Sequence, residues 1–175
     1  NVQDVLRDGC DAGIRYDERL EQDVIALPIG PRRQRFAVAA APAYLSQHGR
    51  PTHPRDLMHH QCIRGRYATG VMPAWEFERE GESYSIQVNG PLVVSVGSAV
   101  DLAVDSAIAG TGVINLFEEW LQPAFASGQL EPILQPWWLS FSGPYLYYHD
   151  RRLIPVPLQA FIDFVRERNA LPRDE

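Results

Sequence analysis

The stretch PLVVSVGSAVDLAVDSAIAGTGVINL, residues 91–116, predicts a strand, a turn, a helix, a glycine stop and a second strand in one continuous run. A short β-rich run opens it, and apolar residues then recur at the spacing of a helix with one buried stripe. Ser98 is predicted to be the N-cap, Gly110 and Gly112 to end the helix, and residues 113–116 to resume a strand. The stretch is therefore typical of one half-unit of an α/β domain.

A helix that begins where a strand ends points free backbone N–H groups at the crevice beside the sheet. Such groups bind anions without any side-chain charge. We therefore expect Ser98, with the backbone of Gly97, to bind a carboxylate or a phosphate. The alternative is a structural crossover in which Ser98 only caps the helix.

The composition excludes several classes of protein. With 175 residues and 45% hydrophobic content, the chain can bury a core as one domain or two small lobes. Its 22 acidic and 16 basic residues give a net charge of −6, which is unlike the basic surface of a nucleic-acid binder. Every apolar run is broken well before the roughly 18 residues of a membrane span. We expect a soluble, cytoplasmic protein with no membrane partner.

The two cysteines and the first residues bear on cellular context. Cys10 and Cys62 form neither a close pair nor a disulfide framework, which fits reduced thiols in a cytosol. Val2, Val5 and Leu6 share a helical face that ends at Gly9, so the chain opens on the last turns of a helix. We therefore expect a fragment of a longer protein.

Short strands and helices alternate along the rest of the chain, which favours an α/β fold. Strands are predicted at residues 12–16, 24–29, 35–40, 62–64, 75–79, 84–88, 130–134 and 145–148. Helices or helical turns are predicted at residues 42–49, 54–59 and 117–125, and the last helix is expected to place Leu158, Phe161, Ile162 and Val165 on one face. The hairpin between residues 75 and 88 is expected to turn at residues 80–83.

Seven blocks in a fixed order carry a family resemblance. They are residues 11–15 (DAGIR), 41–45 (APAYL), 54–63 (PRDLMHHQCI), 75–77 (WEF), 99–116, 130–132 (LEP), and Arg151-Arg152 through residues 161–164 (FIDF). Each block is weak alone, but together they span residues 5–168. The chain resembles the effector-binding domain of LysR-type transcriptional regulators.

The resemblance implies an α/β, periplasmic-binding-protein-like (type 2) bilobal fold, in which two lobes are joined by two crossover strands. Lobe one would be residues 1–40 and 143–175, without its first strand and helix, and lobe two would be residues 41–142. The crossovers would lie near residues 36–40 and 143–147. A small-molecule effector would bind between the lobes of a homodimer or tetramer. DNA would be bound only through a winged helix-turn-helix domain that this chain lacks.

Four further residues are candidates for effector contacts. Thr69 could donate a hydrogen bond and Gly70 would admit a ligand to the backbone, where the family's second lobe faces its cleft. Arg15, with Tyr16 beside it, could pair with a carboxylate through both guanidinium nitrogens. The alternatives are a turn before Pro73 and a surface ion pair of Arg15 with Asp11 or Asp17. We expect the effector to be an organic anion.

Other residues tempt other assignments. His53, His59, His60 and Cys62 lack the paired spacing of a zinc site, so we predict no metal. Ser98, Asp101 and His149 could be named as a triad, but no nucleophile elbow surrounds a serine, so we predict neither catalysis nor a cofactor. The aromatic residues of 137–148 are interpreted as core or hinge, and Arg32, Arg33 and Arg35 as a solvated edge. A solute-binding protein of a transport system and an α/β enzyme are the competing functions.

Overall fold

The computed structural model describes residues 9–16, 24–149 and 154–170. Within these ranges no helix is long and apolar enough to cross a membrane. The helical turns expected over residues 2–6, and Arg151-Arg152, lie outside the described residues.

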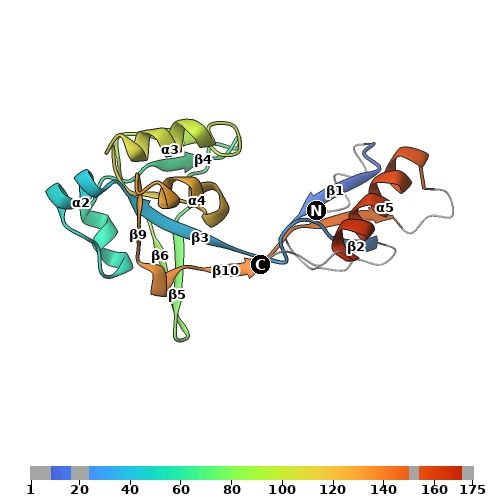
Figure 1. Ribbon diagram of the computed structural model, residues 1–175, viewed down its shortest axis with the longest axis horizontal. Helices are drawn as coiled ribbons and strands as arrows, with labels where there is room; N and C mark the ends of the chain where they lie inside the picture. Colours follow the sequence, from blue (N-terminus) through green and yellow to red (C-terminus); the bar gives the residue numbers. More distant parts are fainter. Residues whose placement is uncertain (1–8, 17–23, 150–153, 171–175) are drawn as a thin grey trace. The chain divides into compact units, whose positions relative to one another are not determined.

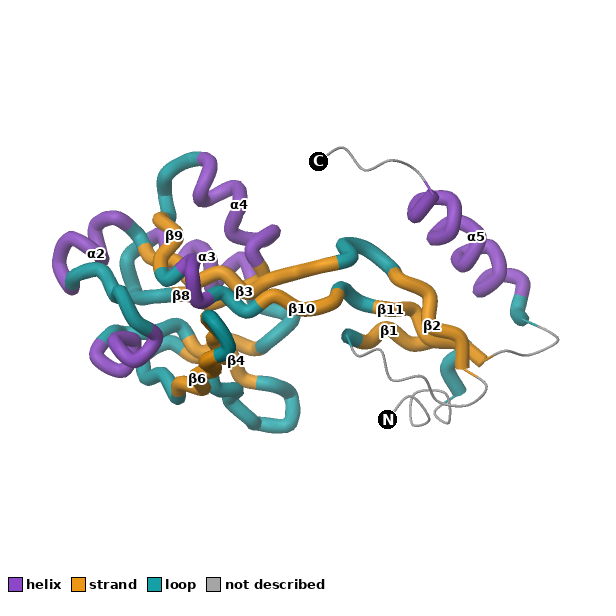
Figure 2. Tube along the Cα trace, turned by 90° about the horizontal axis from the view of Figure 1, so that it is seen from below, coloured by secondary structure: helices purple, strands orange, loops and turns teal. Residues whose placement is uncertain are grey.

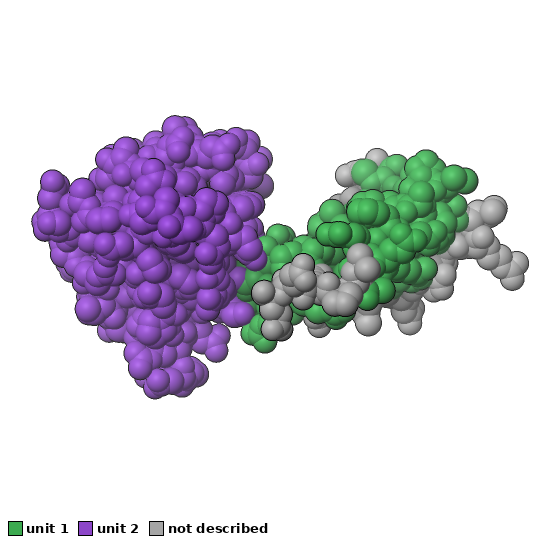
Figure 3. Space-filling model, in the orientation of Figure 1, with its two compact units in different colours: residues 1–34, 141–175 green, residues 35–140 purple. Residues whose placement is uncertain are grey.

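The chain divides into two compact units, coloured separately in Figure 3. Unit 1 comprises Asn1–Gln34 and Phe141–Glu175, and unit 2 comprises Arg35–Ser140. The chain enters unit 2 within β3 (Arg33–Ala40) and leaves it within β10 (Ser140–Ser142), so both boundaries fall inside strands. Each unit is described on its own below.

In its described residues, unit 1 is a three-stranded antiparallel sheet with one helix packed on it. The strands are β1 (Ala12–Arg15), β2 (Val24–Pro28) and β11 (Tyr145–His149), in the order β1-β11-β2, and the helix is α5 (Val156–Ala170). Leu146, Tyr148 and Ile162 are buried between sheet and helix, and Figure 2 shows α5 running along one side of the strands. On the expected apolar face of α5, Ile162 and Val165 are buried, whereas Phe161 is 40% exposed.

Unit 2 contains the other described elements, several of which Figure 1 labels. They are α2 (Pro42–His48), η1 (Pro54–His59), β4 (Arg64–Arg66), β5 (Trp75–Arg79), β6 (Glu82–Ile86), β7 (Val93–Ser95), α3 (Val100–Ile108), β8 (Ile114–Phe117), α4 (Glu118–Ala126), β9 (Glu131–Ile133) and η2 (Gln135–Trp137). β3 pairs antiparallel with β8, β9 and β10, β4 pairs parallel with β7, and β5 pairs antiparallel with β6.

The core of unit 2 is built on β3, whose residues 37–40 are all buried. Small side chains there let neighbouring strands and helices approach closely, and Val38 lies in register with both Asn115 of β8 and Ile133 of β9. Large apolar residues from other elements, such as Leu57 and Phe77, fill the remaining space.

Local chemistry fixes the ends of the helices after β3. α2 begins with Pro42, whose missing N–H costs nothing there, and ends at Gly49, with a φ of 82°. η1 begins with a capping box, in which His53 accepts from the Arg55 N–H and Asp56 accepts from the His53 N–H. These caps account for the helical segments expected at residues 42–49 and 54–59.

The helix predicted within residues 91–116 is confirmed as α3, but two of its predicted end signals are wrong. The N-cap is Ala99 and not Ser98, because the chain makes a turn at residues 95–98 before the helix starts. Gly110, with a φ of 84°, does end the helix. Gly112 instead allows a close approach, since a Cβ there would lie 2.4 Å from the Gln61 carbonyl oxygen.

The β5–β6 hairpin projects from the rest of unit 2 (Figure 1) and turns earlier than expected. Glu80 and Gly81 both have positive φ, 53° and 84°, as the two-residue turn of a right-twisted hairpin requires. The second strand therefore begins at Glu82, two residues before the predicted start. This register places Phe77 opposite Tyr84.

Candidate functional site

The candidate site of unit 2 lies where β4 and β7 end. The two strands are parallel and in register, with Arg64 opposite Val93 and Arg66 opposite Ser95. The Val96 N–H donates to the Arg66 carbonyl at 3.0 Å, which continues the pairing into the next loop. Because the carboxyl ends of parallel strands meet at one edge of a sheet, the loops that follow both strands start at the same edge.

The loop after β4 carries Thr69 and Gly70. A tight turn closes it, with the Gly70 N–H donating to the Tyr67 carbonyl at 2.8 Å and the Tyr67 N–H donating to the Val71 carbonyl at 2.9 Å. Gly70 has a φ of 85°, and the space where its Cβ would lie is open. The turn therefore holds the exposed Thr69 hydroxyl in a fixed backbone frame.

The loop after β7 carries Gly97 and Ser98. The Ser98 N–H lies 3.4 Å from the Ser95 carbonyl, and Gly97 takes the positive φ of 85° that this turn needs. Within the described part of the chain the Ser98 hydroxyl has no hydrogen-bond partner, and α3 has no side-chain cap. The capping interpretation of Ser98 is therefore wrong, and its exposed hydroxyl remains available to a ligand.

The start of α3 offers a weaker contribution to anion binding than the sequence predicts. The first bond within the helix runs from the Ala103 N–H to the Ala99 carbonyl, which leaves the preceding N–H groups without helical partners. Asp101 in the first turn, however, already interacts favourably with the helix dipole. An anion at this edge therefore needs a further positive charge.

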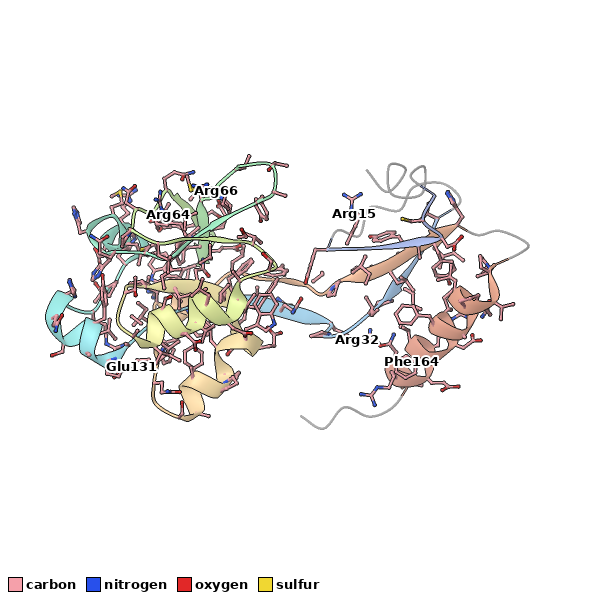
Figure 4. The ribbon with its side chains drawn as sticks, turned by 90° about the horizontal axis from the view of Figure 1, so that it is seen from above. Arg15, Arg32, Arg64, Arg66, Glu131 and Phe164 are labelled. Carbon is pink, nitrogen blue, oxygen red and sulfur yellow. The ribbon has the colours of Figure 1, made fainter. Side chains whose placement is uncertain are left out.

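Two arginines that were not singled out from the sequence supply that charge. Arg64 and Arg66 alternate on β4, so both project from the same face of the strand, and Figure 4 shows them close together. The Nε atom of Arg64 is buried and has no hydrogen-bond partner in the described structure. Arg66 is exposed and takes part in no ion pair between described residues. The pattern Arg-Gly-Arg at the end of a strand was the signal that could have identified them.

The two remaining candidates, Arg15 and Tyr16, lie in unit 1. Arg15 is the last residue of β1, in register with Tyr145 of β11, and its side chain extends from the strand end in Figure 4. The Tyr16 ring meets the Phe141 ring edge-on, with centroids 6.0 Å apart. The structure thus brings Thr69, Gly70, Gly97 and Ser98 to one edge of unit 2, and Arg15 next to Tyr16 in unit 1.

The histidine and cysteine cluster has structural partners. His53 caps η1, and His60 Nδ1 lies 3.2 Å from the Tyr44 hydroxyl. Burial raises the pKa of the Cys62 thiol to about 12, so the thiol stays protonated. Among the described residues no three histidine, cysteine or acidic side chains are placed to hold a metal ion.

Two aromatic residues and one arginine also have structural roles. Trp137 is buried in the core, and Trp138 donates its indole N–H to the Ile133 carbonyl at 2.9 Å. Arg35, expected on a solvated edge, forms a two-pronged ion pair with Glu118 and lies 5.1 Å over the Trp138 ring. The Arg35 side chain is 50% exposed, so this ion pair lies on the solvated edge that the sequence predicts.

Nearly the whole chain is similar to known transcriptional regulators. Residues 1–170 match the family described as LysR substrate binding domain. A putative transcriptional regulator of Pseudomonas aeruginosa is 38% identical over 165 residues, which cover 94% of this chain and 53% of that protein. The HTH-type transcriptional regulator PgrR of Escherichia coli is 30% identical over 171 residues, which cover 97% of this chain and 56% of that protein. The chain spans about half the length of these relatives.

Solved structures share the fold. The regulatory domain of AphB in Vibrio vulnificus superposes with a TM-score of 0.75 at 21% identity, covering 93% of this chain and 77% of that one. CrgA, a LysR-type transcriptional regulator from Neisseria meningitidis, gives 0.71 at 23% identity, covering 98% of this chain and 56% of that one. The expected α/β, periplasmic-binding-protein-like bilobal fold is confirmed.

Proposed function

Because the chain belongs to the LysR substrate-binding domain family and is the effector-sensing domain of a transcriptional regulator, we propose that it recognises a small organic anion at the carboxyl ends of β4 and β7. The observation that supports this proposal is that Arg66 and the two loops that carry Thr69 and Ser98 begin at the same sheet edge. A guanidinium and two hydroxyls provide hydrogen-bond donors for carboxylate oxygens.

Apolar side chains at the same loops suit the carbon skeleton of such an effector. Tyr67, Val71 and Val96 are exposed by 47%, 58% and 46%. Ligand sites commonly combine apolar walls with a few placed polar groups, as this edge does. We retain the prediction that Arg15 and Tyr16 of unit 1 contact the effector.

Sensing also requires that the effector favour one arrangement of the protein over another. We propose that units 1 and 2 are the two lobes of the family fold, and that effector binding changes how paired subunits present the DNA-binding domain of the complete regulator. For the pairing we propose α3, whose outer face exposes Leu102 by 55%. Light scattering that shows a strict monomer over a wide concentration range would contradict this pairing.

The named relatives are regulators, so the observations favour sensing in the cytoplasm over solute transport or catalysis. A thermal-shift screen of organic acids against this chain tests the proposal. A ligand at about 100 times its dissociation constant adds roughly 2.7 kcal/mol of stability. Stabilisation should be clearly smaller in Arg66→Gln and Ser98→Ala and retained in Arg168→Gln, which removes the same charge from α5. Equal stabilisation of all variants would overturn the site.

A further inference from the structure

A tyrosine and two histidines meet in unit 2 beside the chain that leads into β4. The hydroxyl of the buried Tyr44 lies 3.2 Å from His60 Nδ1 and accepts a hydrogen bond from the Gln61 N–H at 2.9 Å. On the other side, the His48 ring stacks on the Tyr44 ring, with centroids 4.3 Å apart and planes 14° from parallel. The half-buried His60 imidazole is thus joined through Tyr44 to α2.

The segment after His60 is held on both sides by backbone contacts. The Cys62 N–H donates to the Asn89 carbonyl and the Ile63 N–H donates to the Val113 carbonyl, both at 2.8 Å. A Cβ at Gly90 would lie 1.9 Å from the Cys62 carbonyl oxygen, so the main chain at Gly90 packs directly against the main chain at Cys62. Because residues 61–63 are packed this closely, a displacement of the backbone at Gln61 is transmitted along the segment to β4.

Protonation of His60 changes the hydrogen bonds at this start. A neutral Nδ1 can accept from the Tyr44 hydroxyl while that hydroxyl accepts from the Gln61 N–H. A protonated Nδ1 donates instead, and the hydroxyl hydrogen must then turn to the Gln61 carbonyl, 3.4 Å away. After protonation the Tyr44 hydroxyl therefore donates across 3.4 Å to the Gln61 carbonyl, a longer hydrogen bond than the 3.2 Å bond that it donates to neutral His60.

The surroundings of His60 decide which form is favoured. Burial and the neighbouring His48 hold the pKa of His60 below its ordinary value, with a smaller contribution from His59, while Asp56 acts in the opposite direction. The thiol of Cys62 stays neutral because burial raises its pKa. The native structure therefore favours neutral His60. Acidification protonates this imidazole and so removes the acceptor to which the Tyr44 hydroxyl donates.

We propose that the Tyr44–His60 contact is an acid-sensitive coupling between α2 and β4, through which protonation of His60 displaces the carboxyl end of β4 and changes effector binding there. The link to effector binding rests on the proposed function, whereas the displacement of β4 does not.

The test is an NMR titration of this 175-residue chain from about pH 7.5 to about pH 5, which brackets ordinary histidine titration. The His60 imidazole is expected to titrate below the ordinary value of 6.5, and the amide shifts of Gly65 and Arg66 are expected to follow the same midpoint. These amide titrations should vanish in His60→Gln and persist in His59→Gln, a matched change at the exposed neighbour. Tyr44→Phe, which keeps the ring and removes the hydroxyl, should weaken them.

Amide titrations at Gly65 and Arg66 that survive in both His60→Gln and Tyr44→Phe would overturn the coupling. Thermal shifts with an organic acid from the screen, taken at both ends of the titration, separate the two proposals. Binding that depends on Arg66 but not on His60 refutes the coupling alone. Amide titrations that depend on His60, in a chain that no organic acid stabilises, refute the effector site alone.

Discussion

Arg66 lies in register with Ser95 in the parallel pair of β4 and β7. The loops that carry Thr69 and Ser98 therefore start level with each other at one sheet edge. Backbone hydrogen bonds hold both loops, including the bond from the Val96 N–H to the Arg66 carbonyl. Because the frame is made by the main chain, side chains at this edge can be replaced without loss of the fold.

Replacement of Arg66 by glutamine should weaken binding of an organic acid by about 10- to 100-fold, since a hydrogen bond to a charged group contributes about 1.5–3 kcal/mol. The free energy of unfolding of the unbound chain should not change, because Arg66 is exposed. Calorimetric titration measures the first quantity and urea denaturation the second. A destabilised chain with unchanged affinity would assign Arg66 a structural role instead.

Gly90→Ala should destabilise the chain by more than about 3 kcal/mol, because the new Cβ would lie 1.9 Å from the Cys62 carbonyl oxygen. Gly97→Ala is the matched control. Its Cβ would enter open space, so only the positive φ of 85° is strained, at a cost of about 1–2 kcal/mol. Urea denaturation of both variants gives the comparison. Equal losses would mean that the Cys62 main chain moves aside without cost.

A thiol reagent at neutral pH should label Cys10 and spare Cys62 in the folded chain. Cys10 is exposed, whereas Cys62 is 1% exposed, and burial raises its pKa to about 12, which leaves almost no thiolate. Mass spectrometry after brief labelling checks this. The variant Cys10→Ser should take up no label until urea unfolds it, and prompt labelling of Cys62 would contradict its burial.

Asp56→Ala should lower the free energy of unfolding by about 1 kcal/mol at neutral pH, since it removes the Asp56 half of the capping box of η1. Hydrogen bonds from the Thr52 and His53 backbone N–H groups hold the pKa of Asp56 below its ordinary value of 3.8. A carboxyl with a lowered folded-state pKa stabilises above its unfolded-state value, and this stabilisation disappears as the pH falls through the folded-state value.

The difference between wild type and Asp56→Ala should therefore narrow below about pH 4. Urea denaturation at a series of pH values measures it. Asp105→Ala, an exposed change on α3, provides the control. A difference that stays constant down to the acid limit of folding would show that the cap acts without the carboxylate charge.

Much of the fold follows from local pattern. The apolar stripe of residues 100–108 predicts α3 because a helix repeats within a few residues, and the strands around Ile14 and Val38 follow from their short β-rich runs. Family resemblance supplied the bilobal fold that this periodicity alone left open. These inferences hold because each depends on neighbours in the sequence.

The predictions that were wrong or missing concern residues whose roles depend on contacts between distant parts of the sequence. Ser98 was predicted to cap α3, but the pairing of β7 with β4 ends in a turn that delays the helix to Val100. The role of Gly112 depends on Gln61, fifty-one positions earlier in the chain. Arg64 and Arg66 gained meaning only once the register with β7 was known, because residue spacing in one strand does not reveal its partner.

Gly90 and Gly112 lie so close to the main chain at residues 61–62 that neither position can accept a larger side chain. Other positions of unit 2 can accept one. A combinatorial library that retains these two glycines, together with Gly70 and Gly97 for their positive φ, can randomise residues 67–69, 71, 96 and 98, because these side chains are exposed. Selection from such a library offers a route to biosensors with new inducers on an unaltered scaffold.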